Sequence, residues 1–239
     1  MIKALSLFFF ISLWISTGQA QVDENSRHLT AEYGLSYHVV QGTDNNNGSS
    51  GTFTSTLSPF WKGSWSHRIS SKWGYRLSYK LQLAEFNDID GSAAIKNEEV
   101  VLNSGEFAVM WMQSTTRQMS VFIRQQDHII YRAIDIETFE LIKQGFAEPG
   151  LGVAWGNRRR IGAQIGFNLQ AFAMLPVETE DIVTGLGYGA GAALRLGWVT
   201  EGGVMVMIKG FYDYGTSPNA TLNFVHEEFG YALQMTYSF

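Results

Sequence analysis

Ten segments of the chain alternate between apolar residues and polar or glycine residues, and this pattern constrains the fold more than any other feature. In the clearest segment, 72–86, the odd positions carry Trp73, Tyr75, Leu77, Tyr79, Leu81 and Leu83, and the even positions include Lys72, Arg76, Ser78, Lys80 and Gln82. Successive side chains of a β-strand point to opposite faces, so this segment is predicted to be a strand with one apolar and one polar face. The pattern indicates an all-β chain.

The same alternation recurs in nine further segments, at 29–40, 53–65, 107–111, 119–123, 150–156, 161–171, 185–198, 204–214 and 229–239. Several of them are longer than the roughly five or six residues typical of strands in soluble proteins. A tilted strand needs about 9–11 residues to cross the hydrocarbon core of a bilayer. Segments of this length, apolar along one whole face, favour strands that span a membrane.

Aromatic residues gather at the two ends of these segments. One group lies beside the short connections and contains Trp65, Trp73, Trp111, Trp155, Trp198, Tyr237 and Phe239; the other contains Tyr37, Phe53, Phe86, Tyr212, Tyr214 and Phe229. Membrane barrels carry two aromatic girdles, because amphipathic rings favour the headgroup level. A sheet in lipid must also close, because every backbone polar group there needs a partner.

The connections alternate in length, as in outer-membrane barrels. The short ones are 66–71, 114–116, 157–159 and 200–202, and the long ones are 41–51, 87–104, 127–148, 175–184 and 215–228. We therefore predict a transmembrane antiparallel up-and-down β-barrel of ten strands. Counts of eight or twelve stay open, because 127–148 can hold an extra hairpin. The competing fold is a soluble sandwich with Trp73, Leu77 and Leu81 sealed between two layers.

The N-terminus predicts export. Lys3 precedes an apolar run, 4–15, and small residues follow up to Ala20, so residues 1–20 are predicted to be a signal peptide and 21–239 the barrel domain. An even strand count then places both termini in the periplasm. The chain has no Cys, a net charge of −5 and a mean hydropathy of −0.05. These values argue against a disulfide framework, a nucleic-acid binder and a polytopic helical membrane protein.

The closing segment 230–239 alternates and ends in Phe239. With the signal peptide and the ten segments, it makes the chain resemble bacterial outer-membrane β-barrel proteins as a general class. The resemblance implies residence in the outer membrane, contact with lipid and lipopolysaccharide, and recognition of the closing strand by the barrel-assembly machinery. It implies no cofactor and no nucleic-acid partner.

The polar faces predict the lining of the lumen. The charged or ionisable residues expected there are Glu32, His38, Lys62, Arg76, Lys80, Glu106, Arg124, Arg195, Lys209 and Asp213. A wall of inward glycines is expected from Gly150, Gly152, Gly162, Gly166, Gly185, Gly187, Gly189 and Gly191. Glycine in a strand often marks the close approach of another group. We predict that 135–144 forms a short helix, capped by Asp135 and Gly145, that folds into the lumen and rests on this wall.

Charge divides unevenly between the connections. The long ones hold 15 acidic residues, namely Asp44, Asp88, Asp90, Glu98, Glu99, Asp127, Asp135, Glu137, Glu140, Glu148, Glu178, Glu180, Asp181, Glu227 and Glu228. Only Lys96, Arg132 and Lys143 oppose them. The leading interpretation is therefore a structural or surface-interaction protein with acidic surface loops. The alternatives are a narrow, anion-preferring channel lined by Arg76, Lys80, Arg124 and Lys209, and a lipid or peptide hydrolase.

The hydrolase alternative has little support in the sequence, and no catalytic or metal-binding residue is predicted. Asp88-Ile-Asp90 resembles the first acidic pair of omptin proteases, but 178–181 lacks the histidine that the second pair requires. Ser36 and His38 share a face, which is predicted to point into the lumen and not toward lipid. Three further histidines are expected in turns or loops without matching partners: His67 in a turn, His128 and His226 in loops.

Overall fold

The computed structural model describes residues 26–44, 50–88, 94–96, 99–114, 116–133, 138–157, 161–178, 183–218 and 222–239. The predicted signal peptide lies outside them. The described strands are β1 (Arg27–Asp44), β2 (Ser50–Ser55), β3 (Ser58–Arg68), β4 (Trp73–Asp88), β5 (Ala94–Lys96), β6 (Glu99–Met112), β7 (Arg117–Ala133), β8 (Thr138–Gly156), β9 (Gly162–Met174), β10 (Gly187–Val199), β11 (Val204–Pro218) and β12 (Leu222–Ser238). No helix among the described residues is long and apolar enough to cross a membrane.

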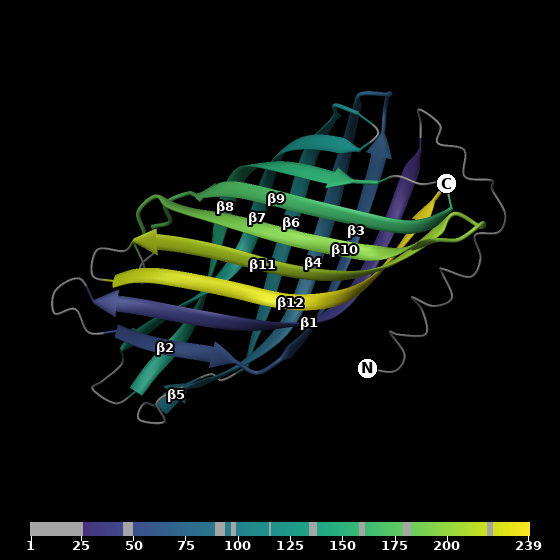
Figure 1. The fold of residues 1–239 in the computed structure, drawn as a ribbon. Coiled ribbons are helices and arrows are strands. Elements are labelled where there is room, and N and C mark those ends of the chain that lie inside the picture. Colours follow the sequence, from purple (N-terminus) through teal and green to yellow (C-terminus); the bar gives the residue numbers. More distant parts are fainter. Residues whose placement is uncertain are drawn as a thin grey trace.

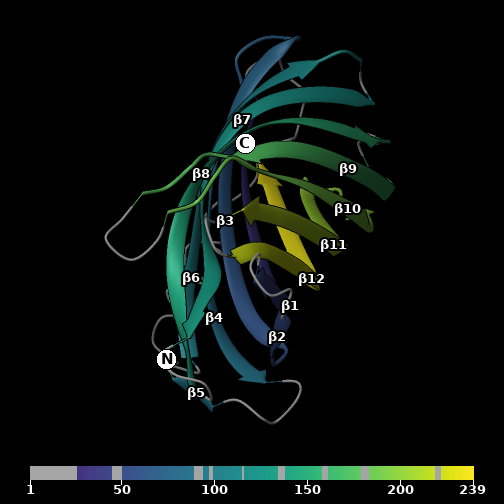
Figure 2. The ribbon, with the colours of Figure 1, turned by 90° about the vertical axis from the view of Figure 1, so that its left-hand side faces the viewer.

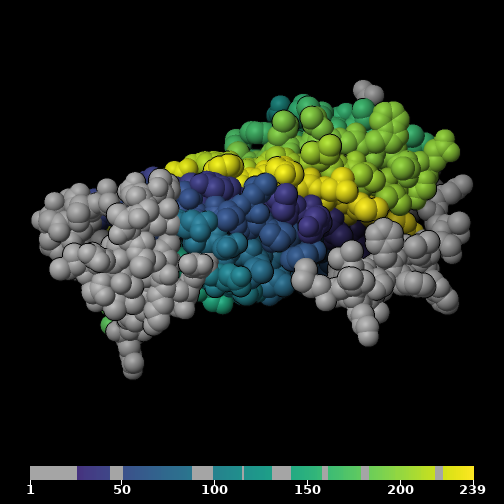
Figure 3. All heavy atoms as spheres, turned by 90° about the horizontal axis from the view of Figure 1, so that it is seen from below, coloured from purple at the N-terminus to yellow at the C-terminus, as the bar shows by residue number. Residues whose placement is uncertain are grey.

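The strands close into a barrel (Figures 1 and 2). Each wall strand pairs antiparallel with the next, and β12 pairs with β1 from His28↔Ser238 to Asp44↔Leu222. β2 and β3 both lie between β1 and β4, so together they form one wall strand. The wall therefore has ten strands, which confirms the predicted fold class. In Figure 3, the yellow atoms of β12 adjoin the purple and blue atoms of the first strands.

The apolar faces point outward. Trp73, Leu77 and Leu81 are 51%, 46% and 39% exposed, whereas Gln82 on the opposite face of β4 is buried. A soluble sandwich would bury the first three, so that alternative is wrong. An apolar exterior around a polar interior suits a lipid environment, since the closed ladder leaves no sheet edge for the hydrocarbon to meet.

The two ends of the barrel differ. At one end, called here the short-turn end, β3 and β4, β6 and β7, β8 and β9, and β10 and β11 are joined by short connections. The opposite end is called the long-loop end. There the strands continue well into the predicted loops: β7 extends to Ala133 and β8 begins at Thr138. The segment 127–148 is thus a hairpin, as one alternative supposed, but it prolongs β7 and β8 and adds no wall strand.

This hairpin leaves the wall. The ladder between β6 and β7 ends at Ser104↔Gln126, and the ladder between β8 and β9 ends at Gly150↔Phe172, whereas β7 and β8 stay paired as far as Ala133↔Phe139. We call residues 127–133 and 138–149 the arm. The neighbouring residues Ile129 and Ile130 are both buried, so both faces of β7 are covered there. β7 also contacts β1 and β12, which are not its ladder neighbours, so the arm bends across the lumen.

Side chains hold the arm where it departs. Asp127 Oδ2 accepts hydrogen bonds from the backbone N–H and from Nδ2 of Asn103, at 2.9 and 3.1 Å, just beyond the last backbone pair with β6. On the other side, the N–H of Leu175 donates to the carbonyl of Ala147 at 2.9 Å. The departure of the hairpin is thus fixed on both sides.

The prediction of a helix at 135–144 is wrong for the described part of that segment. Residues 138–144 form a strand, because the ladder with β7 satisfies their backbone hydrogen bonds.

The predicted apolar face of 53–65 is not continuous. Thr56 and Leu57 interrupt the wall strand and shift the alternation by one residue, so Phe53 points into the barrel. Phe53 and Phe86 are buried in the lumen and do not belong to an outer girdle.

Candidate functional site

An unbroken chain of polar side chains, all buried except the partly exposed Lys80, joins the wall of the lumen to the arm. From β1, β4 and β12 come Ser36, His38, Lys80, Gln82, His226 and Glu228, and from β7 and β8 come Arg124, His128 and Glu148. On the side formed by β1, β4 and β12, Glu228 forms an ion pair with Lys80 and accepts a hydrogen bond from Ser36 Oγ at 2.7 Å. We call these nine residues the polar chain.

Three histidines join the two sides of this chain. His38 Nδ1 lies 3.0 Å from His226 Nε2, and His226 Nδ1 lies 3.1 Å from His128 Nδ1. His128 Nε2 is 2.5 Å from Glu148 Oε1, whose second oxygen accepts from Arg124 Nε at 2.6 Å. The imidazoles therefore connect β1 and β12 of the wall to the arm.

One set of tautomers satisfies the whole series with neutral imidazoles. Gln82 Nε2 lies 2.7 Å from His38 Nε2 and can only donate, so His38 Nε2 accepts and His38 Nδ1 carries the hydrogen. His38 then donates to His226, His226 donates through Nδ1 to His128, and His128 donates through Nε2 to Glu148. Each ring donates one hydrogen bond and accepts one, so every hydrogen bond in the series is donated in the direction from Gln82 toward Glu148.

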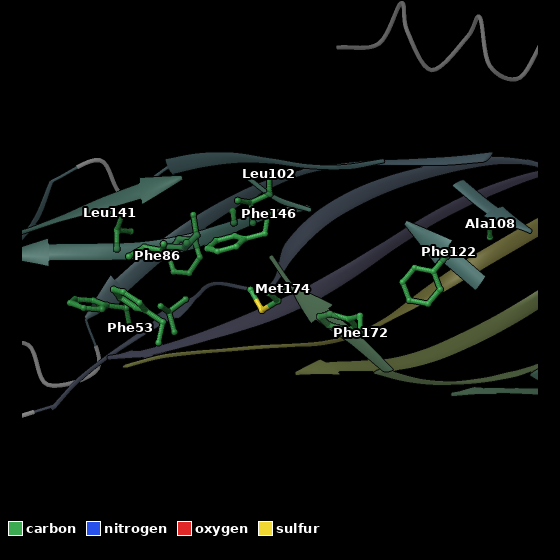
Figure 4. Close-up of a cluster of buried hydrophobic side chains, with 14 residues drawn as sticks. Phe53, Phe86, Leu102, Ala108, Phe122, Leu141, Phe146, Phe172 and Met174 are labelled. Atoms are coloured by element: carbon green, nitrogen blue, oxygen red, sulfur yellow. The ribbon is translucent and has the colours of Figure 1, made fainter. Parts of the chain in front are cut away.

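Most of a cluster of buried apolar side chains lies at the long-loop end, above the polar chain, whereas two of its members, Ala108 and Phe122, lie farther toward the short-turn end (Figure 4). Phe53 and Phe86 come from the wall, and Leu141 and Phe146 come from the arm; all four are nearly inaccessible to solvent. The cluster also contains Val40, Ala84, Leu102, Ala108, Phe122, Ile129, Ile130, Phe172, Met174 and Phe224. An apolar filling of this kind excludes water, so it closes the lumen at this end.

The short-turn half of the lumen is hollow. A cavity of about 630 Å³ extends from the polar chain, where Lys80, Arg124 and Glu228 border it, to Arg68 and Asn157 at the short-turn end. Its walls carry seven basic and four acidic side chains. Arg76 and Glu106, paired at 2.7 Å, lie on this wall, and the Arg76 side chain is 32% exposed. The barrel thus encloses a charged cavity that is shut at the long-loop end.

The structure brings nine of the ten predicted lumen residues to this cavity. Glu32, Lys62, Arg76, Lys80, Glu106, Arg124, Arg195, Lys209 and Asp213 line it, whereas His38 lies in the polar chain beyond it. Most of the charges are paired: Lys209 Nζ donates to Glu32 at 2.9 Å, and Gln170 Nε2 donates to Asp213 at 2.7 Å. The lining is therefore an ordered network with a surplus of positive charge.

The predicted glycine wall accommodates neighbouring side chains and not the arm. A Cβ on Gly150 would lie 2.4 Å from the ring of Phe122, and one on Gly189 would lie 2.2 Å from the ring of Phe172. At none of the eight glycines of this wall do the nearest atoms belong to the described arm residues. The prediction that 135–144 rests on this wall is therefore wrong for its described part, 138–144. The arm instead reaches the wall formed by β1 and β12.

The sequence analysis missed two histidines and misplaced two carboxylates. His128 and His226 lie in strands and have partners, contrary to the prediction. Glu148 and Glu228 were expected in acidic surface loops, but both are buried and hydrogen-bonded in the polar chain. The alternation of the strands carried the missing signal, because every second residue faces the lumen. His128 lies at an inward position of β7, four residues after Arg124, and His226 and Glu228 lie at inward positions of β12.

This arrangement offers little surface for catalysis. Ser36 is fully buried and its hydroxyl donates to Glu228, so no substrate can reach it without rearrangement. Among the described residues, no cluster of His, Asp and Glu has a metal-binding arrangement. The three imidazoles hydrogen-bond in series and do not converge on one point. The side chain of Asp88 and the whole of Asp90 lie outside what the structure describes.

No family model matches the chain, and no curated protein matches it. Solved structures do resemble it. The outer membrane protease OmpT from Escherichia coli has a TM-score of 0.56 and 9% identity, over 95% of this chain and 100% of that chain. The translocator domain of the autotransporter NalP from Neisseria meningitidis has a TM-score of 0.41 and 8% identity, over 99% and 94%.

An outer membrane channel from Pseudomonas putida F1 has a TM-score of 0.45 and 8% identity, over 94% of this chain and 100% of that chain. Identities this low show the fold alone, because one fold carries many functions. The chain therefore has the fold of bacterial outer-membrane β-barrel proteins, as the sequence predicted, and its role must be argued from its own residues.

Proposed function

We propose that this chain is an integral outer-membrane protein that is closed to transport and acts structurally or through its long-loop surface. The observation that carries the proposal is the closure of the lumen by the arm, the polar chain and the apolar cluster. A conducting pore needs a continuous water-filled path, and here buried apolar side chains of the wall and the arm, among them Phe53, Phe86, Leu141 and Phe146, pack together at the long-loop end. We also propose that the short-turn end and both termini face the periplasm.

The partners of this proposal follow from the two surfaces. The exposed apolar band contacts lipid and lipopolysaccharide, and the closing strand that ends at Phe239 is recognised by the barrel-assembly machinery during insertion. The acidic connections give the long-loop end a negative surface, which favours cationic partners or bridging by divalent cations. Of the acidic residues that remain on this surface, the structure describes Glu99 and Glu178, which are exposed, and Glu227, which is partly exposed.

Single-channel conductance of the refolded protein in planar bilayers tests the closure. We expect no steady current from the natural chain. In a shortened variant, Asn-Gly replaces residues 128–144 and joins the paired residues Asp127 and Gly145 as a two-residue hairpin. This variant removes His128 and Leu141, so we expect it to conduct.

A matched control shortens another hairpin. Asn-Gly replacing residues 218–223 joins the paired residues Ser217 and Phe224 and removes no member of the polar chain or the apolar cluster. We expect this control to stay closed. A steady current through the natural chain would contradict the proposal, as would a shortened β7–β8 variant that folds and still carries no current.

One observation favours a second candidate function, an anion-preferring channel. The cavity that lies behind the closure has more basic than acidic side chains. If the arm is displaced under some condition, this lining favours anions. The ratio of anion to cation current through the shortened variant tests the selectivity of the lining, independently of whether the natural chain opens.

A further inference from the structure

The acidic side chains that line the cavity all have partners. Glu32 binds Lys209, Glu106 binds Arg76, Glu228 binds Lys80, and Asp213 accepts from Gln170. Arg124 is paired in turn with Glu148. Two cations well inside the cavity, Lys62 and Arg195, have no ion-pair partner within 4 Å among the residues that the structure describes. The positive surplus of the lining is therefore carried by these two residues inside the cavity and by Arg68 at its short-turn end.

Both residues also face like charges directly across a strand pair. Arg195 on β10 is opposite Lys209 on β11, and Lys62 on β3 is opposite Lys80 on β4. On its other side Lys62 is opposite Glu32 of β1, but the ion pair of Glu32 is with Lys209. All four basic residues line the same cavity. Like charges directly opposite each other on one face of a sheet are destabilising. An anion between them would remove this repulsion.

Arg195 has unused hydrogen-bonding capacity. Its Nε is buried and has no hydrogen-bond partner, although a buried donor usually has one. The opposing residue of β9 is Gly166, which has no side chain that could serve as an acceptor. Glu32 attracts both Arg195 and Lys62 electrostatically, so the two cations lie in one neighbourhood around the Glu32–Lys209 pair. The guanidinium fork suits an oxyanion.

We propose that this cavity binds a small soluble oxyanion with at least two negative charges, held by Arg195 and Lys62 and admitted through the short-turn end. A volume of about 630 Å³ lies within the range of small-molecule sites. The phosphate and polycarboxylate classes share the required chemistry. This site is independent of the proposed closure, since a cavity shut at one end can bind a ligand that enters at the other.

Thermal unfolding and isothermal titration of the whole refolded chain in an uncharged detergent test the site. The probes are pyrophosphate and citrate, with sodium chloride at matched ionic strength as the control for screening. We expect saturable binding and a rise in Tm with at least one of the two probes, and none with chloride. A preference between the probes distinguishes a phosphate ligand from a polycarboxylate ligand.

Variants separate binding from general electrostatics. We expect Arg195→Gln and Lys62→Gln each to weaken binding about tenfold, the effect of losing one hydrogen bond to a charged group. Lys72→Gln removes an exposed cation of a short turn and is expected to bind as the natural chain does. Without ligand, we expect little change in the Tm of either cavity variant, because each removes both a like-charge pair and an attraction to Glu32.

The proposal is overturned if neither probe binds saturably, or if Lys72→Gln weakens binding as much as the cavity variants do. It is equally overturned if chloride at matched ionic strength reproduces the effect. If Arg195→Gln does not fold, Lys62→Gln alone decides, because Lys62 lies on a different strand and its side chain is partly exposed.

Discussion

The two halves of the lumen are built from the same alternating strands and yet have opposite characters. In the short-turn half, ion pairs such as Arg76–Glu106 line an open cavity. In the long-loop half, pairs such as Arg124–Glu148 are buried between the arm and the wall. Alternation places polar groups inside both halves, and only the inward bend of β7 and β8 makes the second half dry. The lumen is therefore closed by a strand pair that leaves the wall, and the wall strands themselves need not differ between the two halves.

The largest difference between the halves should appear on removing one carboxylate from each. Glu148→Ala leaves the buried Arg124 and the Nε2–H of His128 without an acceptor, which should cost about 3–5 kcal/mol, as for other broken buried ion pairs. Glu106→Ala leaves Arg76 free to turn into the water of the cavity, so about 1 kcal/mol or less is expected. Equilibrium unfolding by urea in vesicles, followed by tryptophan fluorescence, measures both values.

Equal losses from the two variants would contradict the distinction between a dry and a hydrated half. Glu148→Gln refines the comparison, since a neutral amide can still accept from His128 but cannot compensate the charge of Arg124. We expect its loss to be smaller than that of Glu148→Ala and larger than that of Glu106→Ala.

Phenylalanine truncations probe packing in the same two halves. Phe146→Ala should cost about 3 kcal/mol, because the ring is buried in the apolar cluster and its loss leaves a void. Phe211→Ala should cost about 1 kcal/mol, since this half-buried ring borders the cavity, and its contacts are a T-shaped pair with Phe60 and two cations, Lys80 and Lys209. The urea-unfolding assay applies again. A Phe211 variant as damaged as the Phe146 variant would show that the short-turn half is packed and not hollow.

The fold was predictable because strand alternation is a local property that survives any tertiary arrangement. The face of Lys80 or Lys209 follows from its position relative to apolar neighbours, without knowledge of the partner strand. Phe53 was misplaced because Thr56 and Leu57 interrupt the wall strand, and a shift of one residue reverses every face beyond it. Nothing in the local composition of 50–57 marks that interruption.

The polar chain was not predictable from local pattern, because it joins residues far apart in sequence. His128 and His226 are separated by 98 positions, and His38 and His226 by 188. The arm was misassigned for a related reason. Residues 138–144 have the composition of a short helix, but tertiary pairing with β7 outweighs a weak intrinsic preference. The alternation within a strand indicates which side chains point inward, but it does not indicate which of them contact each other.

A smaller loss than for Glu148→Ala or Phe146→Ala is expected at the central imidazole of the polar chain. His226→Phe keeps an aromatic ring between His38 and His128 but cannot accept from the first or donate to the second. The Nδ1–H of His38 is then left unsatisfied in a buried site, as is the Nδ1 acceptor of His128. We expect a loss of about 1–3 kcal/mol, the usual cost of such groups. His67→Phe, which removes one partly exposed contact with the hydroxyl of Tyr75, should cost less than 1 kcal/mol.

Limited proteolysis of the arm gives a second measurement for the same pair of variants. If the histidines fasten the arm to the opposite wall, cleavage within it should become faster in His226→Phe and stay unchanged in His67→Phe. If instead the apolar cluster alone holds the arm, the two variants will be cleaved alike, although their unfolding free energies still differ. The polar chain would then order the lumen without attaching the arm, and closure would depend on side chains such as Phe146 and Leu141.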